Sequence, residues 1–143
     1  RASRASRTTQ ALAAPVPFAP TATDARDVFL GVLPDAAHAA LLLDADGLVV
    51  AGRYRGADGQ DLAADVGAQL SGVSDEASRA MRHLGVGAWT HLAVEAEGAS
   101  VAMAPSGDGI VLVAAPRRVP LGFVRRVLER AAERARRWLE SGT

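Results

Sequence analysis

The sequence predicts a mixed α+β fold in which three helices cover a five-stranded antiparallel sheet, in the chain order α-β-β-α-β-β-β-α. A helical periodicity runs from Asp58 to Leu84, and short apolar runs bounded by turn residues stand on both sides of it. A second amphipathic stretch ends the chain. One long helix on one face of the sheet and two terminal helices on the other would cover both faces.

Composition indicates one globular domain. The chain has 143 residues, of which 49% are hydrophobic and 22% are charged. No apolar run approaches the roughly 18 residues of a membrane span, and the lack of cysteine excludes disulfides and thiolate metal sites. All 16 basic residues are Arg, and Lys and Asn are absent, a bias typical of a GC-rich bacterial genome. We therefore expect a cytoplasmic protein that makes no membrane contact.

The first 23 residues are predicted to be an arm or linker. They are rich in Arg, Ala and Pro, and no period persists through them. The chain does not begin with Met, so we expect a fragment or a processed product. The folded domain is predicted over residues 24–141.

The domain is predicted to begin with a short helix and a hairpin. Thr23 or Asp24 can cap a helix that ends at Leu33, before Pro34. Two apolar strands, 37–43 and 48–54, follow around the turn Asp-Ala-Asp-Gly, which is a strong hairpin signal. Both strands are apolar at successive residues, so both sheet faces should be buried.

The long helix, with Asp58 as its predicted N-cap and Gly85 after its end, has three lengthwise sectors. An apolar stripe and an opposite polar stripe suffice for a helix that faces a core. The third sector carries only small residues, which allow another backbone to approach closely. We therefore predict a contact surface on this sector, made by Ala64, Gly67, Ser71, Ser74 and Ser78.

Three strands and a final helix complete the predicted order. The strands cover residues 88–95, 100–104 and 109–115, with connections of hairpin length. The last helix is predicted from Pro120 to about Leu139. The strand at 88–95 alternates in polarity, and an unpaired edge of this kind needs to be covered or used.

Charge is unevenly distributed along the chain. Residues 8–116 carry five Arg against thirteen acids, a net of −8, whereas residues 117–143 carry eight Arg against three Glu, a net of +5. Solvated faces are the ordinary interpretation. The alternative is a basic helix that docks on an acidic partner.

The hairpin ALLLDADGLVVAGR, the helix LAADVGAQLSGVSDEASRAMRHLG and the ending SGDGIVLVAAPRRVPLGFVRRVLERAAERA resemble the roadblock (dynein light chain) domain family. The resemblance covers about residues 24–139. It implies a homodimer, in which the central helices pack antiparallel and the third strands pair, and which regulates a small Ras-like GTPase. We predict a dimer interface at Ala64, Gly67, Ser71, Ser74, Ser78, Trp89 and His91, and candidate partner-binding residues Arg117, Arg118, Arg126, Arg130 and Arg137.

Catalytic chemistry is not predicted. There is no P-loop, so the chain is not itself a P-loop GTPase, and His38, His83 and His91 are too scattered for a metal motif. No catalytic, metal or cofactor-binding residue is proposed. The leading hypothesis is a non-enzymatic homodimeric scaffold. The alternatives are a small-molecule sensor of the profilin-like or PAS-like type, or a dimerisation module excised from a larger signalling protein. Nucleic-acid binding has support only from charge, and we do not expect it.

Overall fold

A computed structural model describes residues 24–142, so the predicted arm at 1–23 lies outside the described residues. The chain order agrees with the prediction except at the first helix. The elements are the 3-10 helix η2 (Ala25–Asp27), β1 (Ala39–Leu43), β2 (Val49–Arg53), α2 (Ala63–Leu84), β3 (Leu92–Glu95), β4 (Ala99–Ser106), β5 (Gly109–Pro116) and α3 (Leu121–Ser141).

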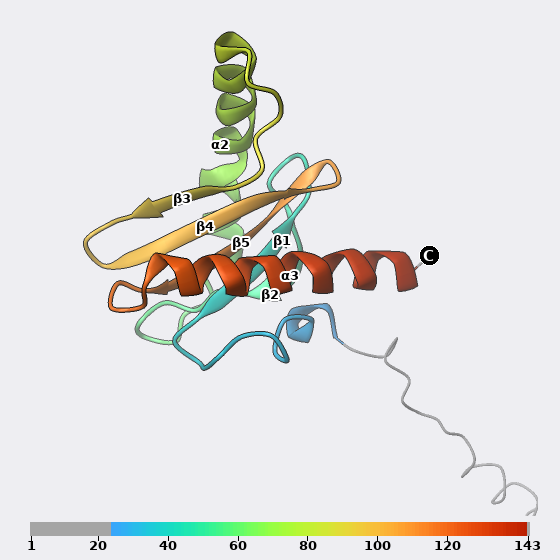
Figure 1. Cartoon of the computed structure of the whole chain (residues 1–143). Coiled ribbons are helices and arrows are strands. Elements are labelled where there is room, and N and C mark those ends of the chain that lie inside the picture. Colours follow the sequence, from blue (N-terminus) through green and yellow to red (C-terminus); the bar gives the residue numbers. More distant parts are fainter. Residues whose placement is uncertain (1–23, 143) are drawn as a thin grey trace, which may run out of the picture.

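The sheet has five antiparallel strands in the order β2-β1-β5-β4-β3. Figure 1 shows α3 lying across one face of this sheet, while α2 runs behind the other face and extends beyond it. The predicted fold class is therefore confirmed. The pairing of β5 with β1 joins the β1–β2 hairpin to the strands β3, β4 and β5 in one sheet.

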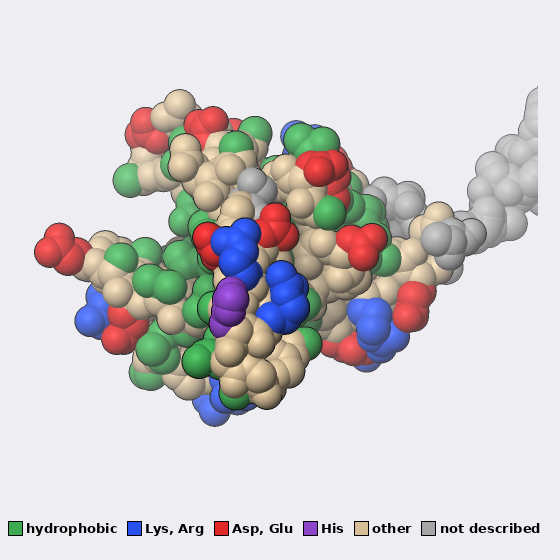
Figure 2. Space-filling view, turned by 90° about the horizontal axis from the view of Figure 1, so that it is seen from above, with side chains coloured by type: hydrophobic (Ala, Val, Ile, Leu, Met, Phe, Trp, Pro, Cys, Tyr) green, Lys and Arg blue, Asp and Glu red, His purple; other side chains and the backbone are tan. Residues whose placement is uncertain are grey.

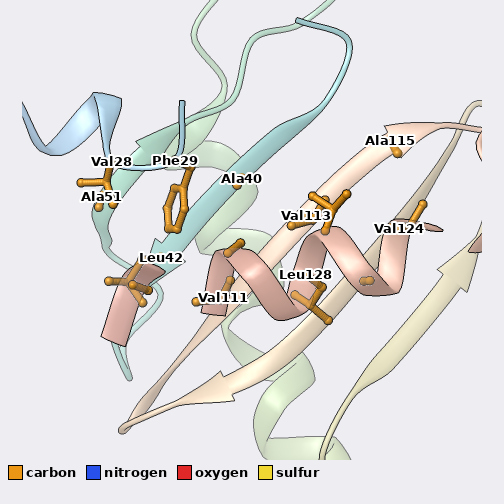
Figure 3. Close-up of a cluster of buried hydrophobic side chains, with 14 residues drawn as sticks. Val28, Phe29, Ala40, Leu42, Ala51, Val111, Val113, Ala115, Val124 and Leu128 are labelled. Carbon is orange, nitrogen blue, oxygen red and sulfur yellow. The ribbon is translucent and has the colours of Figure 1, made fainter. Parts of the chain in front are cut away.

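Two clusters of buried side chains fill the faces of the sheet. The first lies under α3 and joins Phe29, Leu42, Val113 and Leu128 with their neighbours (Figure 3). The second lies under α2 and includes Leu41, Leu43, Met103, Ile110 and Leu112. Successive residues of β1 thus enter opposite clusters, which explains the unbroken apolar run in the sequence.

The hollows around these layers are open to solvent. Two of them, of about 510 Å³ and about 400 Å³, lie at the margins of the α3 side. Neither is an enclosed chamber between sheet and helix, which a sensor of the profilin-like or PAS-like type would need.

The predicted Asp-Gly hairpin is confirmed. The Oδ1 atom of Asp44 accepts hydrogen bonds from the backbone N–H groups of Asp46 and Leu48, at 2.9 Å and 3.0 Å. Gly47 has a φ of 84°, which favours glycine. The side chain of Asp44 thus closes the turn by the local hydrogen bonding typical of Asx residues.

The long helix starts later than predicted. Asp58 accepts a hydrogen bond from the N–H of Gln60 in a separate turn, and α2 begins at Ala63 after the uncapped Leu62. The predicted N-cap at Asp58 is therefore wrong. Gly85 ends the helix in the left-handed conformation with a φ of 69°, as predicted.

The first predicted helix is replaced by a short 3-10 helix and a series of turns. The carbonyl of Val28, which a continuing α-helix would bond to Val32, instead accepts from Nε of Arg134 on α3 at 3.0 Å. The N–H of Val32 bonds to Phe29, one residue nearer. Packing against α3 therefore overrides the weak helical propensity of this segment.

Candidate functional site

The apolar side of α2 is only partly covered by its own sheet. Leu70 is half-buried, whereas Leu84 is 68% exposed at the end that projects beyond the sheet. The residues that contact the second core cluster are Val66, Leu70 and Val73, all in the first half of the helix. We define the α2 stripe as Val66, Leu70, Val73, Ala77, Met81 and Leu84.

The helix is turned so that the boundary between its apolar and small-residue sectors faces the sheet. Among the α2 residues whose burial is described, Ala63 and Gly67 are the buried ones. A Cβ atom placed on Gly67 would lie 2.3 Å from the carbonyl oxygen of Gly47 in the β1–β2 turn. The close backbone approach predicted at Gly67 is thus made within the chain, and the prediction that a partner fills that space must be corrected.

The other small residues do not share one environment. Ala64 is exposed, while Ser74 and Ser78 are half-buried, and Ser74 borders a small hollow beside the β1–β2 turn. The side chain of Ser71 lies outside the described part of the structure. The predicted interface sector is therefore divided between the chain's own hairpin and its surface.

The edge strand β3 lies on the same side of the molecule as the exposed end of α2 (Figure 1). It pairs only with β4, and Val94 on it is 50% exposed. Val86, in the connection from α2, is 66% exposed. Figure 2 looks onto this side and shows a histidine and basic side chains near the centre, with hydrophobic side chains reaching the surface around them. An apolar surface and an open strand edge therefore adjoin.

Trp89 and His91 precede β3, because that strand is shorter than predicted. Trp89 is half-buried and packs against the second core cluster, so it contributes to the chain's own core. His91 is also half-buried. Of the three histidines, His83 is exposed on α2 and His38 is buried beside β1.

The five candidate partner-binding arginines do not form one surface. Arg117 donates from Nε to the carbonyl of Ala96 at 3.1 Å and lies 3.4 Å from Glu95, so it holds the β3–β4 turn. Arg118 is exposed in the loop before α3. The other three, Arg126, Arg130 and Arg137, line a groove on α3, across the sheet from α2. These three therefore lie on the opposite face of the sheet from the α2 stripe (Figure 1).

The titratable side chains of His38 and Asp35 contact each other before β1. Nδ1 of His38 lies 3.0 Å from Oδ1 of Asp35, and this hydrogen bond lowers the pKa of the Asp35 carboxyl below its usual range. Within residues 24–142, no three His, Asp or Glu side chains converge as a metal ion would require. No helix in this part of the chain is both long and apolar enough to cross a bilayer.

Sequence reasoning missed the exposed apolar residues of this surface. Val66, Leu70, Val73, Met81 and Leu84 share a stripe with helical spacing, which ordinarily indicates a face buried in the core. Periodicity shows that the helix has an apolar stripe. It does not show which part of the stripe's length packs against the sheet. The exposure of Val86 and Val94 left no signal in the sequence, since single apolar surface residues are common.

The sequence of this chain is similar to those of known proteins. A model of the Roadblock/LC7 domain matches residues 31–115. Protein MJ1340 of Methanocaldococcus jannaschii is 32% identical over 94 residues, which are 66% of this chain and 80% of that protein.

Solved structures show the same fold. The Roadblock/LC7 domain from Streptomyces avermitilis is similar with a TM-score of 0.68 and 20% identity, covering 82% of this chain and 99% of that one. Myxococcus xanthus MglB gives 0.63 and 19%, covering 88% and 99%. A structure described as MglB with a tetrameric arrangement gives 0.69 and 20%, covering 90% and 96%. With the match over residues 31–115, these likenesses establish that the chain belongs to the Roadblock/LC7 domain family.

Proposed function

We propose that this chain is a non-enzymatic regulatory domain that forms a homodimer through α2 and β3 and binds a small Ras-like GTPase on the resulting surface. The observation that carries the proposal is the α2 stripe, whose second half has no contact with the core clusters. Leu84 is 68% exposed and Val86 66% exposed beside it. Exposed apolar groups that lie together favour burial against a partner.

A second copy is the partner that this geometry favours. The β3 edge offers unpaired backbone groups, and Val94 adds apolar surface to it. Two copies related by a two-fold axis would pair their β3 edges and pack their α2 helices antiparallel, so that each stripe covers the other. Self-association of the similar MglB, described with a tetrameric arrangement, supports this proposal.

The proposed GTPase contact rests on family membership and on the side of α2 that the proposed dimer would leave exposed. The side of α2 away from the stripe carries Asp65, Asp75, Glu76, Arg79 and Arg82, which are all exposed. In the proposed dimer, this side of both helices would face solvent and form one continuous charged surface. Such a surface suits a reversible, charge-steered contact with a switch protein.

Self-association is tested with the adjacent substitutions Leu84→Glu and His83→Glu. Both positions are exposed in the last turn of α2, but only Leu84 belongs to the α2 stripe. Burial of a charge at the interface should weaken self-association by about ten-fold or more for L84E. H83E should leave it nearly unchanged. Sedimentation equilibrium measures both, and a wild-type chain that stays monomeric at high concentration contradicts the proposal.

GTPase binding is tested with purified Ras-like GTPases encoded by the same genome, each loaded with GDP or with a non-hydrolysable GTP analogue. Calorimetry gives the affinity in each nucleotide state, and single-turnover hydrolysis and release of a fluorescent nucleotide show which step changes. We expect one nucleotide state to bind preferentially, with a changed rate of hydrolysis or exchange. A dimer that binds neither state of any of them would refute the GTPase part alone.

A further inference from the structure

A groove runs along the outer side of α3, facing the turns that follow η2. Its volume is about 510 Å³, and we call it the α3 groove; its lining residues are Val32, Phe123, Arg126, Glu129, Arg130, Glu133, Arg134 and Arg137. Val32 and Phe123 are half-buried and pack against the first core cluster. The apolar part of the groove is therefore held in place by the core beneath it.

Two basic side chains of the α3 groove make contacts within the chain. The guanidinium carbon of Arg126 lies 5.7 Å from the ring centroid of Phe123, a cation–π distance. Nε of Arg134 donates to the carbonyl of Val28 at 3.0 Å. Guanidinium groups that are already positioned lose less conformational entropy when they bind a carboxylate.

The positive charge of the α3 groove is only partly neutralised. Glu133 pairs with Arg136 and Arg137, and these hydrogen bonds lower the pKa of its carboxyl and keep it ionised. Glu129, which lines the groove, lies 3.5 Å from Arg125, which does not line it. Arg126 and Arg130, which are one helical turn apart, have no carboxylate within 4.0 Å among residues 24–142.

We infer that the α3 groove is a second docking surface, which takes an acidic segment of a partner protein with an apolar anchor side chain. The carboxylates would pair with Arg126 and Arg130, and the anchor would lie on Val32 and Phe123. Bidentate pairing makes Arg well suited to carboxylates, and an apolar floor selects segments with a large anchor.

This surface extends beyond the proposed dimer and GTPase contacts. α2 and α3 cover opposite faces of the sheet (Figure 1), and the clusters beneath them share no residue. A segment in the α3 groove would therefore leave the α2 stripe free, so both surfaces can be occupied together.

The test uses fluorescence anisotropy with a short fluorescein-labelled peptide, in which a Phe-Leu pair is flanked by Asp and Glu. Arg126→Ala with Arg130→Ala should weaken binding by about ten-fold or more, since two charge-assisted contacts are lost. The control, Arg26→Ala with Arg55→Ala, removes the same charge from exposed positions outside the groove. It should change the affinity by less than about two-fold.

A second peptide, with Ser-Ser in place of Phe-Leu, separates anchoring from simple charge attraction. It should bind about ten-fold more weakly, and backbone amide shifts caused by the first peptide should centre on Val32, Phe123 and Arg130. Equal binding of the two peptides, equal loss in the two Arg variants, or no binding to the wild-type chain would overturn the inference. L84E should bind the peptide normally, so a monomeric chain leaves this test intact.

Discussion

At the scale of single residues, Gly67 and Gly72 show how neighbours decide the role of a residue. Both lie inside α2 and look alike in the sequence. A Cβ atom on Gly67 would meet the carbonyl oxygen of Gly47 at 2.3 Å, whereas one on Gly72 would meet nothing within 4 Å. Gly67 therefore permits a close approach of helix and hairpin, and Gly72 has no such steric role.

We expect Gly67→Ala and Gly72→Ala to have opposite effects on stability. The first should lower the free energy of unfolding by about 1–3 kcal/mol, because backbone must move to admit the methyl group. The second should raise it by about 0.5–1 kcal/mol through helix propensity. Urea denaturation measures both, and a G67A chain at least as stable as the wild type would show that the hairpin does not press on the helix.

The pair Asp24 and Arg26 gives a prediction about protonation. The side chain and backbone N–H of Arg26 donate to Asp24, which lowers the pKa of this carboxyl from 3.8 to about 2. The folded state thus binds this proton less readily than the unfolded state. The stability contributed by the pair is complete above pH 3.8 and is lost as the pH falls toward 2.

Arg26→Gln should return the pKa of Asp24 toward 3.8, since the guanidinium contact is its largest cause. Carbon-detected NMR titration of the carboxyl groups follows Asp24 directly. Arg55→Gln is the control, because Arg55 bonds to the carbonyl of Gly59 and not to Asp24. An unchanged titration in R26Q would mean that the contact does not persist in solution.

At the scale of elements, the sequence predicted most strands and both long helices, and the differences have identifiable causes. The segment after Asp24 forms only the 3-10 helix η2 and turns, and the carbonyl of Val28 accepts from Arg134 rather than from the N–H of Val32. Val28 and Arg134 are 106 positions apart, so no local pattern could reveal the contact. Likewise, the amphipathic pattern located α2 but left open how the helix turns toward the sheet.

The β3–β4 hairpin depends on Arg117, which sequence reasoning assigned to a partner. Arg117 holds the carbonyl of Ala96, whose own N–H donates to Ala99 in the turn at 2.9 Å. Arg117→Ala should speed hydrogen exchange of the Ala96 amide several-fold, with less than about 1 kcal/mol lost from global stability. Arg118→Ala should leave that exchange rate unchanged, and equal exchange in both variants would remove this structural role.

At the scale of the whole molecule, the layered architecture was predictable because it follows from chain order. Two apolar runs before the long helix, three runs after it and two amphipathic helices leave few ways to cover both faces of a sheet. The candidate surfaces were less predictable. The α2 stripe and the α3 groove depend on how far each helix extends past its supporting sheet and on which Arg side chains already have partners.

Thermal stability should depend on concentration if copies associate as proposed. Association of folded copies stabilises the folded state relative to the unfolded chain. Tm should therefore rise by several degrees when the protein concentration is raised about a hundred-fold. Scanning calorimetry measures this shift. L84E should show a flatter dependence than H83E. Superimposable wild-type transitions at all concentrations would oppose a folded oligomer.

The placement of α2 and α3 on opposite faces of one sheet has a consequence for valency. If copies pair through α2, each brings its own α3 groove, and the two grooves face away from the symmetry axis. A ligand chain bearing two acidic segments, joined by a linker long enough to span them, would then bind with avidity, because the second contact becomes intramolecular. Weak individual sites would thereby give tight and switchable capture that responds to the monomer–dimer balance.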